Sequence, residues 1–398
     1  VGPVDFSIDT TVSVGVSVRA SDRDCENINV NNGGCLTGYG TGASINSDND
    51  NLNFDKWDFT SATVKATHDI SAKYANFGAF GRVKYFYDYV YAENDMRFRD
   101  LLGDAKEQLD YGVDILDAFV YGDFVIADSV PVTVRVGNQV VNWGESLFLQ
   151  GGINAFQAVE VTALRTPGAE LKETLTPMPM GYSSATYGDT SVEAFWQWDW
   201  EKTEIDPSGS FFAGLDIAGR GPNPGILGSP DDITLGNNQF DGIAYLQVEG
   251  DTVDEDSAEF GAALRHYSET INGGTEFGLY YSHYTSRLPF LGYQAGTVDA
   301  ATACAAIGGC VNATTSQLAL LNASDSSKIE WVYPDSINTI GASASTTIGD
   351  VAFAVEASFT PDMPLQTESN QKLAQMLDAG GFSALFSGGL DPTTSDLV

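Results

Sequence analysis

Residues 60–91 read TSATVKATHDISAKYANFGAFGRVKYFYDYVY, and this stretch decides the fold. Along residues 60–74, and again along residues 77–91, the character of the side chains alternates from one position to the next. Successive side chains of a β-strand point to opposite faces, so this period of two indicates strands rather than a helix. The stretch therefore predicts a β-hairpin that turns at Ala75 and Asn76.

The two runs are long for strands of a soluble protein. Such strands typically have about five or six residues. A strand that crosses a bilayer obliquely needs roughly nine to eleven, with aromatic residues where lipid meets water. The second run ends in Tyr85, Tyr87, Tyr89 and Tyr91. The hairpin therefore favours a membrane-spanning β-barrel, with a soluble two-layer β protein as the alternative.

The composition is strongly acidic. The 398 residues include 54 Asp and Glu against 19 Lys and Arg, which gives a formal net charge of −35. Nucleic acid is excluded as a partner, because phosphate binding depends on clustered cations. The sequence contains no apolar run of the roughly eighteen residues that a transmembrane helix requires, and outer-membrane barrels share this property because only alternate residues face lipid.

Other alternating runs predict the remaining strands, at residues 5–19, 111–121, 131–142, 191–204, 210–217, 257–270, 275–287, 336–347 and 351–360. These nine and the two of the hairpin make eleven, whereas bacterial single-chain barrels have an even number. The sequence also ends without an aromatic closing strand. We therefore expect the barrel to be incomplete at its C-terminus.

The connections between these strands fall into two classes. Residues 75–76, 122–130, 205–209, 271–274 and 348–350 form the short ones. Residues 20–59, 92–109, 143–190, 218–256, 288–335 and 361–398 form the long ones. Outer-membrane barrels have short periplasmic turns and long outer loops. We therefore expect residues 1–398 to form a single antiparallel transmembrane β-barrel in the bacterial outer membrane, with short helices in the extracellular loops.

Four cysteines occur as two close pairs in the long loops, Cys25 with Cys35 and Cys304 with Cys310. Neither pair has zinc-ligand spacing or lies near a histidine. Local disulfides formed in an oxidising compartment are therefore favoured over a metal site.

Several motifs carry a family resemblance: RVGNQVVNWGES at 135–146, GGIN at 151–154, RTPGAELKE at 165–173, SVEAFWQWDW at 191–200 and GASASTTIGDVAFAVEASFTPDMPLQ at 341–366. Together they resemble the bacterial outer-membrane proteins of domain of unknown function 1302. The resemblance spans residues 110–366. It implies a Gram-negative outer-membrane barrel associated with a periplasmic lipid-handling partner and an inner-membrane exporter of the RND class. The family has no established biochemical activity that the resemblance could assign to this protein.

Two groups of residues are candidates for a pore. The polar strand faces would place Arg82, Lys84, Arg135, Glu193 and Arg265 on the inner wall, as a ladder of salt bridges or as the lining of a path for polar or amphipathic solutes. The long segment after residue 142 contributes Trp143, Glu145, Glu170, Lys172 and Glu173. That segment would fold inward as a constriction or plug, or would latch to the rim as a scaffold.

Catalytic and metal sites have little support. The three histidines, His68, His266 and His283, lie on apolar strand faces, with no serine and acid in a recognisable triad pattern. Loop acids that could attract Ca²⁺ are Asp48, Asp50, Asp251, Asp254, Glu255 and Asp256. They lack EF-hand spacing, so solvated loop acids are the favoured interpretation. We expect no enzyme and no cofactor.

The sequence thus predicts a barrel that moves lipid-like or hydrophobic molecules across the outer membrane, surrounded by outer-membrane lipid and lipopolysaccharide. The hydrophobic cargo follows from the family resemblance alone. The alternative is a plugged structural, adhesive or assembly barrel that binds partners through its acidic loops.

Overall fold

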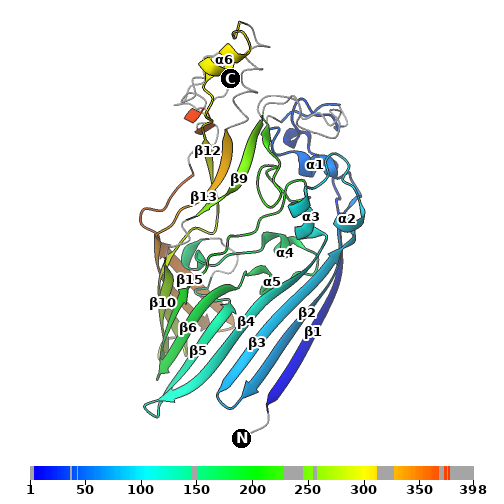
Figure 1. The fold of residues 1–398 in the computed structure, drawn as a ribbon. Helices are drawn as coiled ribbons and strands as arrows, with labels where there is room; N and C mark the ends of the chain where they lie inside the picture. Colours follow the sequence, from blue (N-terminus) through cyan, green and yellow to red (C-terminus); the bar gives the residue numbers. More distant parts are fainter. Residues whose placement is uncertain are drawn as a thin grey trace.

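The computed structural model describes residues 4–35, 38–42, 44–145, 151–226, 245–253, 258–311, 327–366, 372–373 and 375–376. The protein is all-β, with a large barrel-like antiparallel sheet whose long loops gather at one end (Figure 1). In the described parts of the chain, no helix is both long and apolar enough to cross a membrane.

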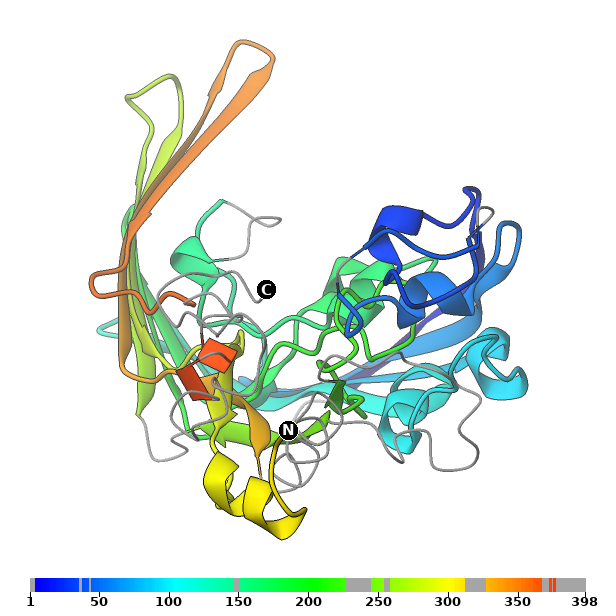
Figure 2. The same ribbon diagram turned by 90° about the horizontal axis from the view of Figure 1, so that it is seen from above.

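The large sheet has eleven strands, and each pairs with the next in chain order. They are β1 (Asp5–Val18), β2 (Phe59–Tyr74), β3 (Phe77–Asp88), β4 (Tyr111–Ile126), β5 (Val130–Gln139), β6 (Met178–Tyr187), β7 (Thr190–Gln197), β10 (Glu259–Ser268), β11 (Thr275–Tyr284), β14 (Ile337–Ile348) and β15 (Val351–Phe359). No described strand pairs with the free edge of β1 or of β15. The sheet is therefore curved but open between these two strands (Figure 2).

The opening hairpin is confirmed. Strands β2 and β3 pair from Thr63 opposite Asp88 to Tyr74 opposite Phe77. Ala75 takes a φ of 52° in the two-residue turn between them. Two-residue hairpin turns require such left-handed backbone because it matches the twist of the strands.

The count of eleven strands agrees with the sequence prediction because two errors cancel. Residues 210–217 do not form a strand, and Phe211 packs against Phe54 among the loops at 5.5 Å. Strand β6 lies within 143–190, which was predicted to be a loop. Its side chains Met178 and Met180 are buried inside the curve of the sheet. This apolar inner face differs from the polar inner face of β2 and hid β6 from the sequence analysis.

The division into short and long connections is confirmed, but the bounds of several short turns differ from the prediction. Residues 75–76, 127–129, 188–189, 269–274 and 349–350 are the short turns, and all lie at the same end of the antiparallel sheet. The turn at 188–189 takes the place predicted for 205–209. The turn at 127–129 is shorter than predicted because β4 extends to Ile126.

The outer face of the sheet is apolar. Val64, Tyr85, Trp198 and Leu279 come from well-separated positions and are between 43% and 58% exposed. Polar side chains on the same strands point inward, and Thr63 is 2% exposed. A soluble two-layer protein would bury the apolar face instead.

The long loops contain regular structure that the sequence did not predict. Ranges 218–256 and 288–335 contribute β8 (Gly225–Ile226), β9 (Tyr245–Val253), β12 (Phe290–Gln294) and β13 (Lys328–Tyr333). These form a four-stranded sheet in the order β12-β13-β9-β8, with β13 parallel to β9. Helix α6 (Ala300–Ala306) lies beside it and carries one cysteine of the Cys304–Cys310 disulfide.

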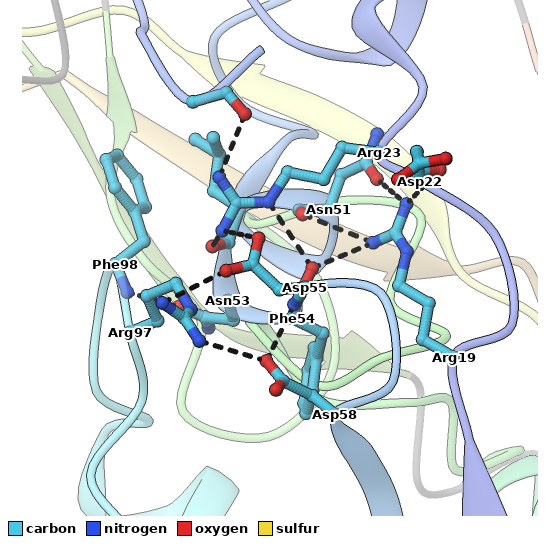
Figure 3. A network of polar contacts seen from close by, with 12 residues as sticks. Arg19, Asp22, Arg23, Asn51, Asn53, Phe54, Asp55, Asp58, Arg97 and Phe98 are labelled. Carbon is cyan, nitrogen blue, oxygen red and sulfur yellow. Dashed lines mark hydrogen bonds and ion pairs between the residues drawn. The ribbon is translucent and has the colours of Figure 1, made fainter. Parts of the chain in front are cut away.

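The first two long loops are held together by arginines. They contain η1 (Cys25–Asn27), α1 (Asn49–Asn53), α2 (Tyr89–Glu93) and α3 (Gly103–Leu109), with a disulfide joining Cys25 to Cys35. The Arg19 guanidinium donates to the Asn51 carbonyl at 3.2 Å. Arg23 and Arg97 both pair with Asp55 at 3.0 Å (Figure 3). These contacts join residues 20–59 to the loop that follows β3.

A buried acid joins the loop after β7 to the same assembly. The Asp216 carboxylate accepts the backbone N–H groups of Asp48 at 3.1 Å and Asn49 at 3.4 Å. Asp216 is 2% exposed, and this burial, with the nearby Asp48 carboxylate, raises its pKa to about 8.

We predict that this loop contact weakens as the pH rises. An acid whose folded pKa is raised contributes stability below its unfolded pKa, near 3.8, that is lost as the pH passes its folded value, near 8. Hydrogen exchange at residues 28–54, corrected for intrinsic rates, should accelerate roughly tenfold or more across that interval, since each pKa unit is worth about 1.4 kcal/mol. Asp216→Asn should flatten the profile, and an unchanged profile in this variant would contradict the assignment.

Candidate functional site

The segment between β5 and β6 lies on the concave side of the sheet. This inner segment, residues 143–145 and 151–177, contains η2 (Gly152–Asn154), α4 (Val161–Arg165) and α5 (Leu171–Thr174). It crosses the space within the curve (Figure 2) and contacts strands at both free edges. The inner segment thus lies within the curve of the sheet and is attached to strands at its edges.

The WGE motif fixes the inner segment to β7 and β15. The Trp143 indole is fully buried and its Nε1 donates to a Glu193 carboxylate oxygen at 2.9 Å. The backbone N–H of Glu145 donates to the Glu356 carboxylate at 2.8 Å. A Cβ at Gly144 would lie 2.2 Å from that carboxylate, and the backbone φ is +73°, so a larger residue would displace Glu356 and strain the backbone.

An apolar core forms where the inner segment meets the sheet. The Phe156 ring lies 4.6 Å from Phe195, and Trp143 lies 5.0 Å from Phe195, between ring centroids. Ile153 fills the space above Gly341, where a Cβ would lie 2.3 Å from its side chain. These contacts come from a loop and from the inner faces of strands, so alternation along the strands does not reveal them.

The PGAELKE motif fixes the other end of the inner segment to β1 and β2. Pro167 packs against Gly15, where a Cβ would lie 2.5 Å from the proline ring. The Glu173 carboxylate forms an ion pair with Lys65 and accepts the Thr67 hydroxyl at 2.8 Å. Both charged side chains are almost wholly buried. The inner segment therefore bridges the open sheet from β15 to β1.

A chain of ion pairs continues from Lys172 along the wall. The Lys172 ammonium lies 3.0 Å from Glu170 and 3.5 Å from Asp69. Asp69 also pairs with Arg82 at 2.7 Å, and a second Arg82 nitrogen lies 2.7 Å from Asp117. A register shift between β3 and β4 occurs beside Arg82. Such a bulge re-aims side chains, and Asp117 is buried there.

The other predicted wall cations also contact neighbours: Lys84 lies 2.9 Å from Asp114, Arg265 lies 3.3 Å from Glu193 and 3.5 Å from Glu276, and the Arg135 guanidinium stacks on Phe119 and Tyr182. The arrangement of the described wall is thus that of a salt-bridge ladder across strands. Glu193 connects it to the Trp143 indole.

The inner segment borders two cavities of different character. A polar cavity of about 140 Å³ lies towards β2, β3 and β4, with both signs of charge in its wall: Lys65, Lys84, Asp114, Glu160, Glu173 and Arg220. Burial raises the pKa of Glu160 to about 7. This side chain therefore changes charge near neutral pH.

The second cavity, of about 360 Å³, is predominantly apolar and lies at the loop end of the sheet, near β11 and β14. We call it the apolar cavity, and its aliphatic lining includes Val159, Val161, Leu164, Leu171, Leu175 and Leu288. The sequence predicted an apolar patch on this segment but not a cavity.

Arg287 in the wall of the apolar cavity was not predicted. Its side chain is 2% exposed, and one Nη lies 2.5 Å from Glu259 and donates to the side-chain Oε1 of Gln197 at 2.8 Å. Its Nε donates to the Phe156 carbonyl at 2.8 Å. Burial lowers the pKa of this guanidinium. The one sequence signal was its position as the last residue of the predicted strand at 275–287.

The histidines contact neutral side chains: His68 bonds Thr10 and Tyr85, His266 bonds Thr190, and His283 bonds Asn338. Asp251 pairs with Lys202 at 2.6 Å. In the described residues, no three His, Cys, Asp or Glu side chains are grouped to hold a metal. Asp254, Glu255 and Asp256 lie outside those residues.

The fold and the inner segment together define a class, an open barrel-like β-sheet bridged from within by the connection between β5 and β6. The model of the family described as "Protein of unknown function (DUF1302)" matches residues 1–395, and the chain belongs to this family. No curated protein and no solved structure matches it. Two motifs behind the resemblance lie at the two ends of the inner segment: the described part of WGES, residues 143–145, and PGAELKE, residues 167–173.

We predict that the buried Lys65–Glu173 pair is a main attachment of the inner segment. Lys65→Met would leave Glu173 buried without a cation and should lower the free energy of unfolding by about 3–5 kcal/mol. Replacing both partners by apolar residues, Lys65→Met with Glu173→Leu, should cost less. Urea unfolding followed by tryptophan fluorescence measures the difference.

The matched control is Lys73→Met on the same strand. Lys73 pairs with Asp123 at 3.7 Å, and both side chains are about half exposed. Exposed pairs contribute about 0–1 kcal/mol. Equal losses in the Lys65 and Lys73 variants would contradict the proposed attachment.

Proposed function

We propose that this protein is a bacterial outer-membrane β-barrel that moves lipid-like or hydrophobic molecules across the membrane. The observation that carries the proposal is an apolar cavity on the inner side of a sheet whose outer face is also apolar. An apolar exterior fits lipid, and an apolar pocket within a polar wall fits a hydrophobic solute.

The membrane location rests on the outer face. Large contiguous apolar surfaces mark contacts with membranes or partners. Exposed aromatic residues lie towards both strand ends, with Tyr74 and Phe77 at the turn end and Tyr87, Tyr111 and Trp198 at the loop end. Two such girdles are typical of outer-membrane barrels, whose outer face contacts lipid and lipopolysaccharide. The two disulfides agree with an oxidising compartment.

The orientation follows from the connections. Short turns face the periplasm in outer-membrane barrels, so the turn end would face the periplasm and the acidic loops the outside. A periplasmic lipid-handling protein and an inner-membrane RND-class exporter are the proposed partners. Their support is the association described for the family.

A plugged structural or adhesive barrel is the second candidate. The observation in its favour is that buried ion pairs and close glycine contacts hold the inner segment at both ends. If the segment never moves, the acidic loops rather than the interior would carry the function. The two candidates differ in whether the inner segment must move for a solute to pass.

A reversible cross-link separates them. A Cβ built at Gly168 would lie 3.5 Å from the Cβ of Ser13, within the range for a disulfide. In Ser13→Cys with Gly168→Cys, oxidation would lock the inner segment to β1. Uptake of the lipophilic dye N-phenyl-1-naphthylamine into proteoliposomes should fall to the rate of protein-free vesicles and recover after reduction.

Ser13→Cys alone is the control, and oxidation should leave its uptake unchanged. The transport proposal fails if wild-type protein adds nothing to the uptake of empty vesicles. Uptake that exceeds empty vesicles but ignores the cross-link would contradict passage past the inner segment.

A further inference from the structure

Three neighbouring buried hydrogen-bond donors have no acceptor among the described residues, and one of them belongs to Arg287, which lines the apolar cavity. They are one Nη of Arg287, Nε2 of Gln197 and Nε1 of Trp200. The three side chains are neighbours, because Gln197 accepts from Arg287 at 2.8 Å and the Trp200 ring lies 6.0 Å from the guanidinium carbon. More than nine in ten buried polar groups in folded proteins have a partner. A cluster of three unpaired donors therefore points to an acceptor that binds there.

The charge around Arg287 selects the kind of acceptor. Glu259 already neutralises the guanidinium at 2.5 Å, and Glu201 adds a second negative charge nearby. An anionic head group would place a further negative charge beside these two carboxylates. A neutral acceptor such as an ester carbonyl can use the free donors without that repulsion.

The rest of the cavity fits a hydrocarbon chain. Leu164 and Leu171 project from α4 and α5 and are 51% and 43% exposed, and both line the cavity with Leu288. Leaving such side chains in water costs free energy in proportion to the apolar surface exposed. An aliphatic chain along them would remove that cost, while its polar end lies at Arg287.

We infer that the apolar cavity binds a long-chain neutral lipid, with its carbonyl group at Arg287 and its chain along α4 and α5. The inference rests on the proposed function, since it names the class of molecule that the barrel would carry. It adds a preference for a neutral polar head group, which a cavity lined only by apolar side chains would not have.

The test compares four ligands of the same chain length on the whole protein in amphipol. Tritiated methyl hexadecanoate, hexadecane, hexadecanoate and hexadecyltrimethylammonium are delivered on cyclodextrin, and bound ligand is separated by size exclusion. The methyl ester should bind roughly tenfold more tightly than hexadecane, the effect expected for a hydrogen bond from a charged donor. It should also bind more tightly than either ion.

Two variants locate the binding. Leu171→Asp should weaken ester binding at least roughly tenfold by placing a charge in the apolar wall. Leu215→Asp is its control, because Leu215 is 45% exposed outside the cavity lining. Arg287→Lys retains a cation for Glu259 but loses the free Nη donor, so it should abolish the preference for ester over alkane.

Equal affinity for ester and alkane in the wild type would overturn the inference, because buried water would then satisfy the donors. Equal effects of the two leucine variants would overturn it as well. If the ester binds as described but wild-type protein adds nothing to the dye uptake of empty vesicles, the transport proposal fails while the lipid site stands. If dye uptake depends on the protein but the ester binds no more tightly than the alkane, the transport proposal stands and the lipid site is contradicted.

Discussion

The structure depends on one constraint, which is that the apolar face of the large sheet points outward. A sheet that exposes its apolar face has no hydrophobic core of its own on that side, and its interior is a polar wall. The inner segment supplies what the wall lacks. Around Trp143 and Phe156 it forms an apolar core against β7, and at Glu173 it joins β2 through a buried ion pair. Because these contacts reach both free edges, the curvature of the sheet and the position of the inner segment depend on each other.

Much of the fold could be predicted because most strands obey a single rule. Residues 60–91 alternate without interruption, and the structure has them as paired strands with the predicted two-residue turn. The rule failed where a strand contacts the inner segment. Met178 and Met180 of β6 are apolar on the inner face because they pack against a loop folded beneath them. No local pattern encodes which loop returns to cover a strand.

The candidate site was predictable to a similar extent. The alternation of side chains along the strands predicted that Arg82, Arg265 and Glu193 lie on the inner wall. In the structure they lie there and form ion pairs or hydrogen bonds. Sequence spacing did not show which acids they meet, because the contacts join strands far apart in the chain. Arg287 escaped notice for the same reason, since its significance comes from Glu259 and Gln197, on two other strands. The family motifs drew attention to the inner segment, but only the coordinates show that they lie at its two attachments.

The two sides of the inner segment differ in chemistry, with ion pairs towards β2 and aliphatic side chains towards β11. Any solute inside the sheet would meet one environment or the other. The proposal that such a solute crosses a membrane requires the outer face of the sheet to contact lipid. Nitroxide labels at residues 11–16 of β1 test this most directly by electron paramagnetic resonance in liposomes. Labels at Val12, Val14 and Val16 should collide with lipid-soluble oxygen, while those at Thr11 and Ser13 should not. Uniform access of a water-soluble nickel complex to all of these positions would contradict the account.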